Sequence, residues 1–120
     1  MEYTCLAVQK ENASIKLVQN SAYVVHDDEQ RMYREPMVAS FESRAVLTGN
    51  QRPFRFTLIN AHTDPDKVSA REIDNEINVL DDVFVRVRQY EFETAGEEDC
   101  ILLGDLNVST GELQQLSQIP

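Results

Sequence analysis

One strand-helix-strand pattern constrains the fold of this chain more than any other feature. Residues 54–61, FRFTLINA, and 100–103, CILL, are short apolar runs bounded by polar residues, as expected of strands entering a core. Ser69 and Glu72 have the spacing of a capping box and predict a helix over about 69–91. Its apolar side chains recur on one face: Ile73, Ile77, Leu80, Phe84 and Val87. Such a unit normally places its two strands side by side and parallel.

Polar side chains follow both strands of this unit. His62 comes directly after the first strand, and Gly104, Asp105 and Asn107 follow the second. Because parallel strands end at the same edge of a sheet, we expect His62, Asp105 and Asn107 to converge there, where ligands commonly bind. An imidazole, a carboxylate and a carboxamide suit attack on a phosphoester. In the alternative reading, the aspartate and asparagine only build an Asx turn and the histidine is structural.

The first half of the chain predicts further strands. Residues 2–9 and 14–19 flank a polar loop of hairpin size and read as an antiparallel pair. Residues 22–26 and 36–43 read as two more strands, the second opened by a proline. A capping-box spacing at residues 109–112 predicts a short terminal helix. Antiparallel strands combined with a parallel pair predict a mixed α+β fold with helices flanking a sheet.

Length and charge narrow the function classes. The 120 residues suffice for one small domain, and 21 acidic against 11 basic residues give a net charge of -10. Such a chain repels phosphates on average, so a phosphate substrate would require a divalent cation. Alternatively, the acidic residues only keep the surface soluble.

Cysteine content and hydropathy constrain the function less than charge does. Cys5 and Cys100 lie in apolar runs and are expected to behave as small buried side chains, without a disulfide framework. No run approaches the roughly 20 apolar residues of a membrane span, and residues 1–9 lack the pattern of a signal peptide. The sequence predicts a soluble protein, cytoplasmic or secreted, and does not choose between these compartments.

Three segments in order, FTLINAHTDPD, EIDNEINVLDDVF and DCILLGDLNVS, resemble the endonuclease/exonuclease/phosphatase superfamily, in particular its deoxyribonuclease I-like branch. The resemblance implies part of a two-sheet β-sandwich with flanking helices, about half of a four-layer fold. It implies that His62 contacts the scissile phosphate or serves as an acid. It further implies that Asp105 binds the metal ion, and that Asp105 and Asn107 organise the metal, nucleophile and phosphate.

Two further positions resemble the same branch. The segment YREPMVASF resembles the arginine-containing turn before a strand, which implies that Arg34 contacts phosphate. Alternatively, Arg34 is a solvated loop residue. Glu2 resembles the glutamate that partners the catalytic histidine, and its alternative is a merely exposed side chain.

The sequence also departs from the family pattern. We find no earlier strand that ends in a metal-binding glutamate, no later aspartate-containing strand and no terminal Ser-Asp-His motif. His26 and Asp27 have the reversed order and the wrong place for that motif. Residues 1–120 are therefore expected to form one partial domain, the middle section of the fold without its N- and C-terminal parts.

The expected function is metal-dependent phosphodiester hydrolysis of the nuclease type, with Mg²⁺ or Mn²⁺, by a longer parent protein. The 120 residues alone should be weakly active or inactive. The expected partner is nucleic acid or another phosphoester, and an exposed apolar sheet face could form a homodimer. Two alternatives remain: a phosphomonoesterase or lipid-headgroup esterase of the same fold, and a noncatalytic acidic module that binds a basic partner.

Overall fold

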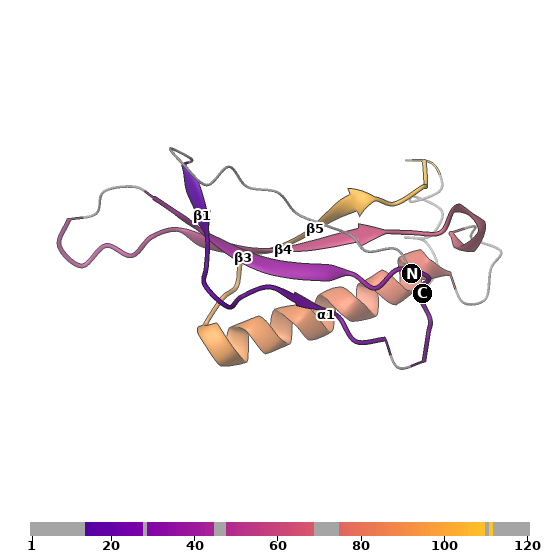
Figure 1. The fold of residues 1–120 in the computed structure, drawn as a ribbon, viewed down its shortest axis with the longest axis horizontal. Helices are drawn as coiled ribbons and strands as arrows, with labels where there is room; N and C mark the ends of the chain where they lie inside the picture. The colour runs from indigo at the N-terminus through magenta and orange to yellow at the C-terminus, as the bar shows by residue number, and fades with distance from the viewer. Residues whose placement is uncertain (1–13, 28, 45–47, 69–74, 110, 112–120) are drawn as a thin grey trace.

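A computed structural model describes residues 14–27, 29–44, 48–68, 75–109 and 111. This part of the chain forms one five-stranded sheet with the long helix α1 along one face (Figure 1). The prediction of a mixed α+β fold is confirmed. A two-sheet sandwich is not, because a single sheet is present among these residues. No helix in the described ranges has the length and apolar content needed to cross a membrane.

The strands lie close to where the sequence pattern places them. Their bounds are β1 (Ile15–Leu17), β2 (Tyr23–Val24), β3 (Met37–Ser43), β4 (Arg55–His62) and β5 (Cys100–Asp105). The order in the sheet is β1-β3-β4-β5, with β2 also pairing with β3. β3 is antiparallel to β1, β2 and β4, whereas β4 and β5 are parallel, as predicted. The strand predicted over 2–9 and the helix predicted from residue 109 lie outside the described residues, apart from Ser109 and Gly111.

The helix α1 (Glu76–Ala95) begins later and ends later than the predicted range of 69–91. Asn75 is its N-cap: the backbone is extended, and its side-chain Oδ1 accepts a hydrogen bond from the Ile77 amide at 2.7 Å. The helix ends at Gly96, whose left-handed backbone allows its amide to bond the Phe92 carbonyl at 2.9 Å. The predicted capping box at Ser69 and Glu72 lies outside the described residues. A short 3-10 helix, η1 (Pro65–Lys67), follows β4.

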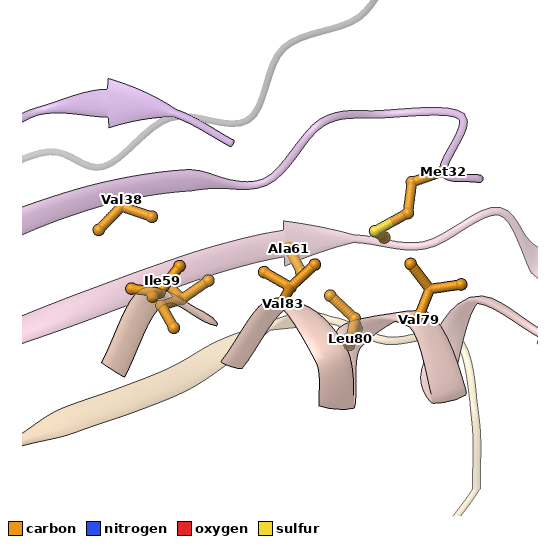
Figure 2. Close-up of a cluster of buried hydrophobic side chains, with 8 residues drawn as sticks. Met32, Val38, Ile59, Ala61, Val79, Leu80 and Val83 are labelled. Carbon is orange, nitrogen blue, oxygen red and sulfur yellow. The ribbon is translucent and has the colours of Figure 1, made fainter. Parts of the chain in front are cut away.

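The hydrophobic core lies between α1 and the sheet. Figure 2 shows helix side chains facing those of β3 and β4, with Met32 reaching in from the preceding loop. The buried cluster consists of Met32, Val38, Ile59, Ala61, Val79, Leu80, Val83 and Val87. Ile77 and Phe84 are only partly buried against it. This core fixes α1 across β3 and β4, and therefore fixes both ends of the helix relative to the two parallel strands.

The opposite face of the sheet is also apolar. Phe41 on β3 stacks on Phe56 of β4, with ring centroids 5.7 Å apart. On the neighbouring β5, Ile101 is 50% exposed and Leu103 is 38% exposed, and Leu17 on β1 is 50% exposed. These exposed side chains lie on β1 and β5, the two ends of the strand order β1-β3-β4-β5, whereas Phe41 on β3 is 2% exposed.

Candidate functional site

The parallel strands β4 and β5 end side by side. Their register pairs Ala61 with Gly104 and His62 with Asp105. At Gly104 the backbone φ is +138°, and a Cβ atom there would lie 2.9 Å from the Ala61 backbone N and C atoms. Only glycine allows β5 to approach the β4 backbone this closely, so Gly104 is required within the strand. The two C-terminal strand residues are thereby held next to each other.

His62 and Asp105 form a pair that solvent reaches. The His62 Nε2 atom lies 3.6 Å from Asp105 Oδ2, and the two side chains are 41% and 65% exposed. A protonated imidazole would form an ion pair with this carboxylate. The pair can therefore accept or donate a proton at the surface, and its carboxylate can face a cation.

Asn107 turns back toward β4. Its backbone has φ of +52°, in the left-handed region that asparagine tolerates better than most residues. Its amide donates to Asp105 Oδ1 at 3.2 Å, which is an Asx turn, and its side-chain Nδ2 donates to the Thr63 carbonyl at 2.8 Å. The Asx turn of the alternative reading is therefore present, and it brings the Asn107 carboxamide to the predicted edge.

Arg34 reaches the same carbonyl from a separate loop. Its Nη1 donates to the Thr63 carbonyl at 3.2 Å, and its guanidinium carbon lies 5.2 Å from the centroid of the Tyr33 ring. The structure therefore brings together four of the five predicted site residues: Arg34, His62, Asp105 and Asn107. Glu2 lies outside the described residues, and its role remains a prediction.

Thr63 is the centre of this arrangement, and sequence reasoning missed it. Its side chain is fully buried. Its amide donates to the Asp105 carbonyl at 3.0 Å, its hydroxyl donates to the same oxygen at 3.4 Å, and its own carbonyl accepts from Arg34 and Asn107. The only signal in the sequence is its position directly after His62, because burial of a polar side chain depends on contacts with distant segments.

Glu76 is a second residue that the sequence did not single out. It is the first residue of α1, it is 1% exposed, and its carboxylate accepts hydrogen bonds from two loop amides, those of Tyr33 and Asp64. Both loops lead into the edge that carries the site residues. In the sequence, Glu76 looks like one more acidic residue of an amphipathic helix.

Among the four predicted site residues at this edge, Asp105 is the one that offers a carboxylate to a divalent cation. In the described part of the chain, no group of three or more His, Cys, Asp or Glu side chains is placed to hold a metal ion. Mg²⁺ nevertheless often keeps several waters and binds through one or two carboxylates together with substrate phosphates. The exposed Asp105 carboxylate meets that requirement.

The His62 and Asp105 side chains at this edge are 41% and 65% exposed. A groove of about 200 Å³ lies elsewhere, between the loop after β2 and α1, and its lining includes none of the four site residues. The groove is lined by residues of both signs, among them Asp27, Arg31, Asp82 and Arg86. The site is therefore defined by its side chains and not by this groove.

Comparison with known proteins finds two curated proteins that contain a similar segment. The chain is 36% identical over 93 residues to "Deoxyribonuclease-1-like 1" of Homo sapiens and 34% identical over 93 residues to the protein of the same name from Chlorocebus aethiops. Each match covers 78% of this chain and 26% of the relative. The chain thus spans about a quarter of the length of the curated relatives it matches. No family model matches it.

Proposed function

We propose that this chain forms the phosphate-contacting edge of a metal-dependent phosphodiesterase of the nuclease type, within a longer parent protein. One observation carries the proposal: Arg34, His62, Asp105 and Asn107 meet at the carboxyl ends of two parallel strands, with Arg34 and Asn107 sharing the Thr63 carbonyl. The similarity to two deoxyribonuclease-like proteins over 93 residues supports it independently.

Each side chain has a distinct role in this proposal. Asp105 holds Mg²⁺ or Mn²⁺, which would supply positive charge for the phosphate and lower the pKa of a bound water. Asn107 donates an N–H to a phosphate oxygen, where negative charge grows during the reaction. Arg34 brings a permanent positive charge to the same edge. His62 donates a proton to the phosphate or to the leaving oxygen.

The geometry also supports an extended substrate. The His62 and Asp105 side chains are substantially exposed, at 41% and 65%, so a phosphate within a polymer can approach them without entering an enclosed cavity. The net charge of -10 opposes this approach and makes the cation necessary for nucleic acid. The same charge favours the phosphomonoesterase or lipid-headgroup esterase alternative over avid binding to DNA.

We further propose that the apolar face formed by Leu17, Phe41, Phe56, Ile101 and Leu103 is covered by a second sheet of the intact domain. Its support is the exposure of Leu17 on β1 and of Ile101 and Leu103 on β5, at the two edges of this face, which a two-sheet sandwich would bury between layers. Sedimentation of the 120-residue chain separates this arrangement from the homodimer alternative. A monomer at micromolar concentration would contradict the homodimer.

The experiment that tests the function is a titration of the isotope-labelled 120-residue chain with Mn²⁺ alone, followed by NMR. We expect saturable paramagnetic broadening of the His62 imidazole and Asn107 carboxamide signals, and its loss in Asp105→Asn. The chain offers a matched control, because His26 also lies beside a carboxylate, with its Nδ1 4.0 Å from Glu35 Oε2. His26 should broaden much less than His62.

Two outcomes would count against the proposal. Equal broadening at His26 and His62, or none at either, would favour the noncatalytic acidic module. Mixing the chain with supercoiled DNA and Mg²⁺ tests a separate point, because we expect little or no nicking by these 120 residues. Robust nicking that Asn107→Ala removes would contradict the expected inactivity and would strengthen the assignment of the site.

A further inference from the structure

The carboxylate of Glu76 bridges two loops that are distant in the sequence. Its Oε1 accepts a hydrogen bond from the Asp64 amide at 2.6 Å, and its Oε2 accepts one from the Tyr33 amide at 2.8 Å. Asp64 follows Thr63 directly, and Tyr33 precedes Arg34 directly. Each oxygen of one side chain therefore holds the neighbour of a residue at the candidate site.

These bonds close a ring with the contact between Arg34 and Thr63. The ring runs from Glu76 to the Asp64 amide, along the backbone to the Thr63 carbonyl, across to the Arg34 guanidinium at 3.2 Å, and through Tyr33 back to Glu76. Thr63 also accepts the Asn107 carboxamide. The position of the guanidinium relative to the carboxamide therefore depends on the distance that Glu76 fixes between the two loops.

We propose that Glu76 is a positioning residue: its buried carboxylate keeps the Arg34 guanidinium next to the Asn107 carboxamide, so that both can contact one phosphate group. The second half of this statement rests on the function proposed above, whereas the positioning of Arg34 does not. The hydrogen bonds of the Glu76 carboxylate go to the Tyr33 and Asp64 amides, and not to His62 or Asp105.

The chemistry of the site requires a carboxylate at this position. Both partners are backbone N–H donors, so the side chain must offer an acceptor to each, and bonds to an ionised acceptor are the strong kind. The helix N-terminus stabilises the same negative charge. A glutamine has one acceptor oxygen, and its NH₂ group would face an N–H donor. Glu76→Gln should therefore release one loop while it keeps the size of the side chain.

The same helix supplies a matched control. Glu91 is 4% exposed, similar to Glu76 at 1%, but its carboxylate lies beside Arg55 and accepts from the Tyr23 hydroxyl, near the other end of α1. Glu91→Gln makes the same chemical change at similar burial. Any effect that both variants share reports lost stability, and an effect confined to Glu76→Gln reports positioning.

The first readout is free of any ligand. In the 120-residue chain, NMR should detect a nuclear Overhauser contact between the Arg34 side chain and Thr63. We expect this contact to disappear in Glu76→Gln and to persist in Glu91→Gln. If it persists in both, while the two variants lose comparable stability in urea, Glu76 is only structural and the inference is wrong.

The second readout uses inorganic phosphate with Mg²⁺ present, followed through the Arg34 and Asn107 side-chain signals. We expect Glu76→Gln to weaken phosphate binding about fivefold or more, as loss of one charge-assisted bond implies, with Glu91→Gln close to the parent. Affinity for Mn²⁺ alone should change little in either variant, because the proposed metal ligand, Asp105, lies on β5 and not in either loop that Glu76 holds. Unchanged phosphate affinity in Glu76→Gln would overturn the proposal.

The two proposals fail in different ways. If the parent chain binds neither Mn²⁺ nor phosphate, the proposed function is wrong, and the Overhauser contact still decides the positioning role. If Glu76→Gln does not fold, Glu76→Asp takes its place: it keeps the charge at the helix N-terminus but is one methylene too short to reach both loops. Retention of the Arg34 to Thr63 contact in Glu76→Asp would then contradict the inference.

Discussion

A glutamate is buried near each end of α1, but the two carboxylates have different partners. At the site end, Glu76 accepts from backbone amides of two loops. At the far end, Glu91 accepts from the Tyr23 hydroxyl at 3.0 Å and lies 3.8 Å from the Arg55 guanidinium. A carboxylate held by backbone fixes where loops lie, whereas one held by side chains joins a helix to a sheet. Burial alone therefore does not distinguish a positioning residue from a structural one.

The far end is also less completely satisfied. Glu97 places its Oε2 3.4 Å from Arg55 Nε, yet this buried Nε lacks a hydrogen-bond partner among the described residues. The Arg55 side chain is 31% exposed, whereas those of Glu91 and Glu97 are 6% and 5% exposed. Arg55 therefore mainly compensates the negative charge of the Glu91 and Glu97 carboxylates and contributes little directional hydrogen bonding. This cluster of Tyr23, Arg55, Glu91 and Glu97 is called the far-end cluster below.

The largest expected effect comes from the glycines that lie near the two ends. Gly104→Ala should destabilise the chain by about 3 kcal/mol or more, because its Cβ would enter the Ala61 backbone and strain a φ of +138°. Urea unfolding followed by circular dichroism measures this cost. Gly96→Ala is the control: it also has a positive φ, +68°, but open space around its Cβ, and should cost about 1 kcal/mol. Equal costs would show that β4 and β5 do not approach closely at the site.

The next effect tests charge compensation in the far-end cluster. Arg55→Met leaves two buried carboxylates without their cation and should cost about 3 kcal/mol. Glu91→Gln should cost less, about 1 to 2 kcal/mol, because Arg55 keeps Glu97 and partial access to water. Unfolding in urea at neutral pH measures both. The opposite ranking would mean that the cluster depends on directional bonds to Glu91.

Sequence patterns predicted the strand-helix-strand unit and three of its site residues because both follow from periodicity. Apolar alternation located β4 and β5, and the length of the connection made them parallel neighbours. His62, Asp105 and Asn107 then had to share an edge. Arg34 came from resemblance alone, since no local pattern links its loop to Thr63.

Thr63, Glu76 and the start of α1 could not be read from the sequence for a different reason. The bonds of Glu76 span 43 residues to Tyr33 and 12 residues to Asp64. No periodicity encodes such contacts, which form only once the loops fold onto the helix. The capping-box spacing at Ser69 led to a predicted start six residues too early, because Asn75 is also a preferred N-cap residue and the structure places the cap there.

A smaller effect concerns the Tyr23 hydroxyl and pH. Burial, reinforced by the hydrogen bond to Glu91 and its negative charge, raises the pKa of Tyr23. The folded chain therefore holds this proton more tightly than the unfolded chain, so the stabilisation is complete below the ordinary tyrosine pKa of about 10 and is lost as pH rises beyond it. Tyr23→Phe should cost about 1 kcal/mol at pH 7 and should flatten the fall in stability above pH 10. An unchanged alkaline slope in urea unfolding would contradict this link between Tyr23 and Glu91.

The smallest expected effect is a change in the reaction rate of a thiol. It tests whether the negative charge of the far-end cluster acts on Cys100 of β5, the strand that also carries Asp105. Cys100 begins β5, and burial followed by the negative charges of Glu97 and Glu91 raises the pKa of its thiol. Because the thiolate is the nucleophile, alkylation by iodoacetamide at pH 8 should be slower in the folded chain than in urea, once Cys5 is replaced by serine. Glu97→Gln should accelerate the folded reaction about twofold, whereas Glu93→Gln, on the exposed side of α1, should not. Equal rates in the two variants would mean that the far-end charges do not act on β5, and that burial alone suppresses the thiolate.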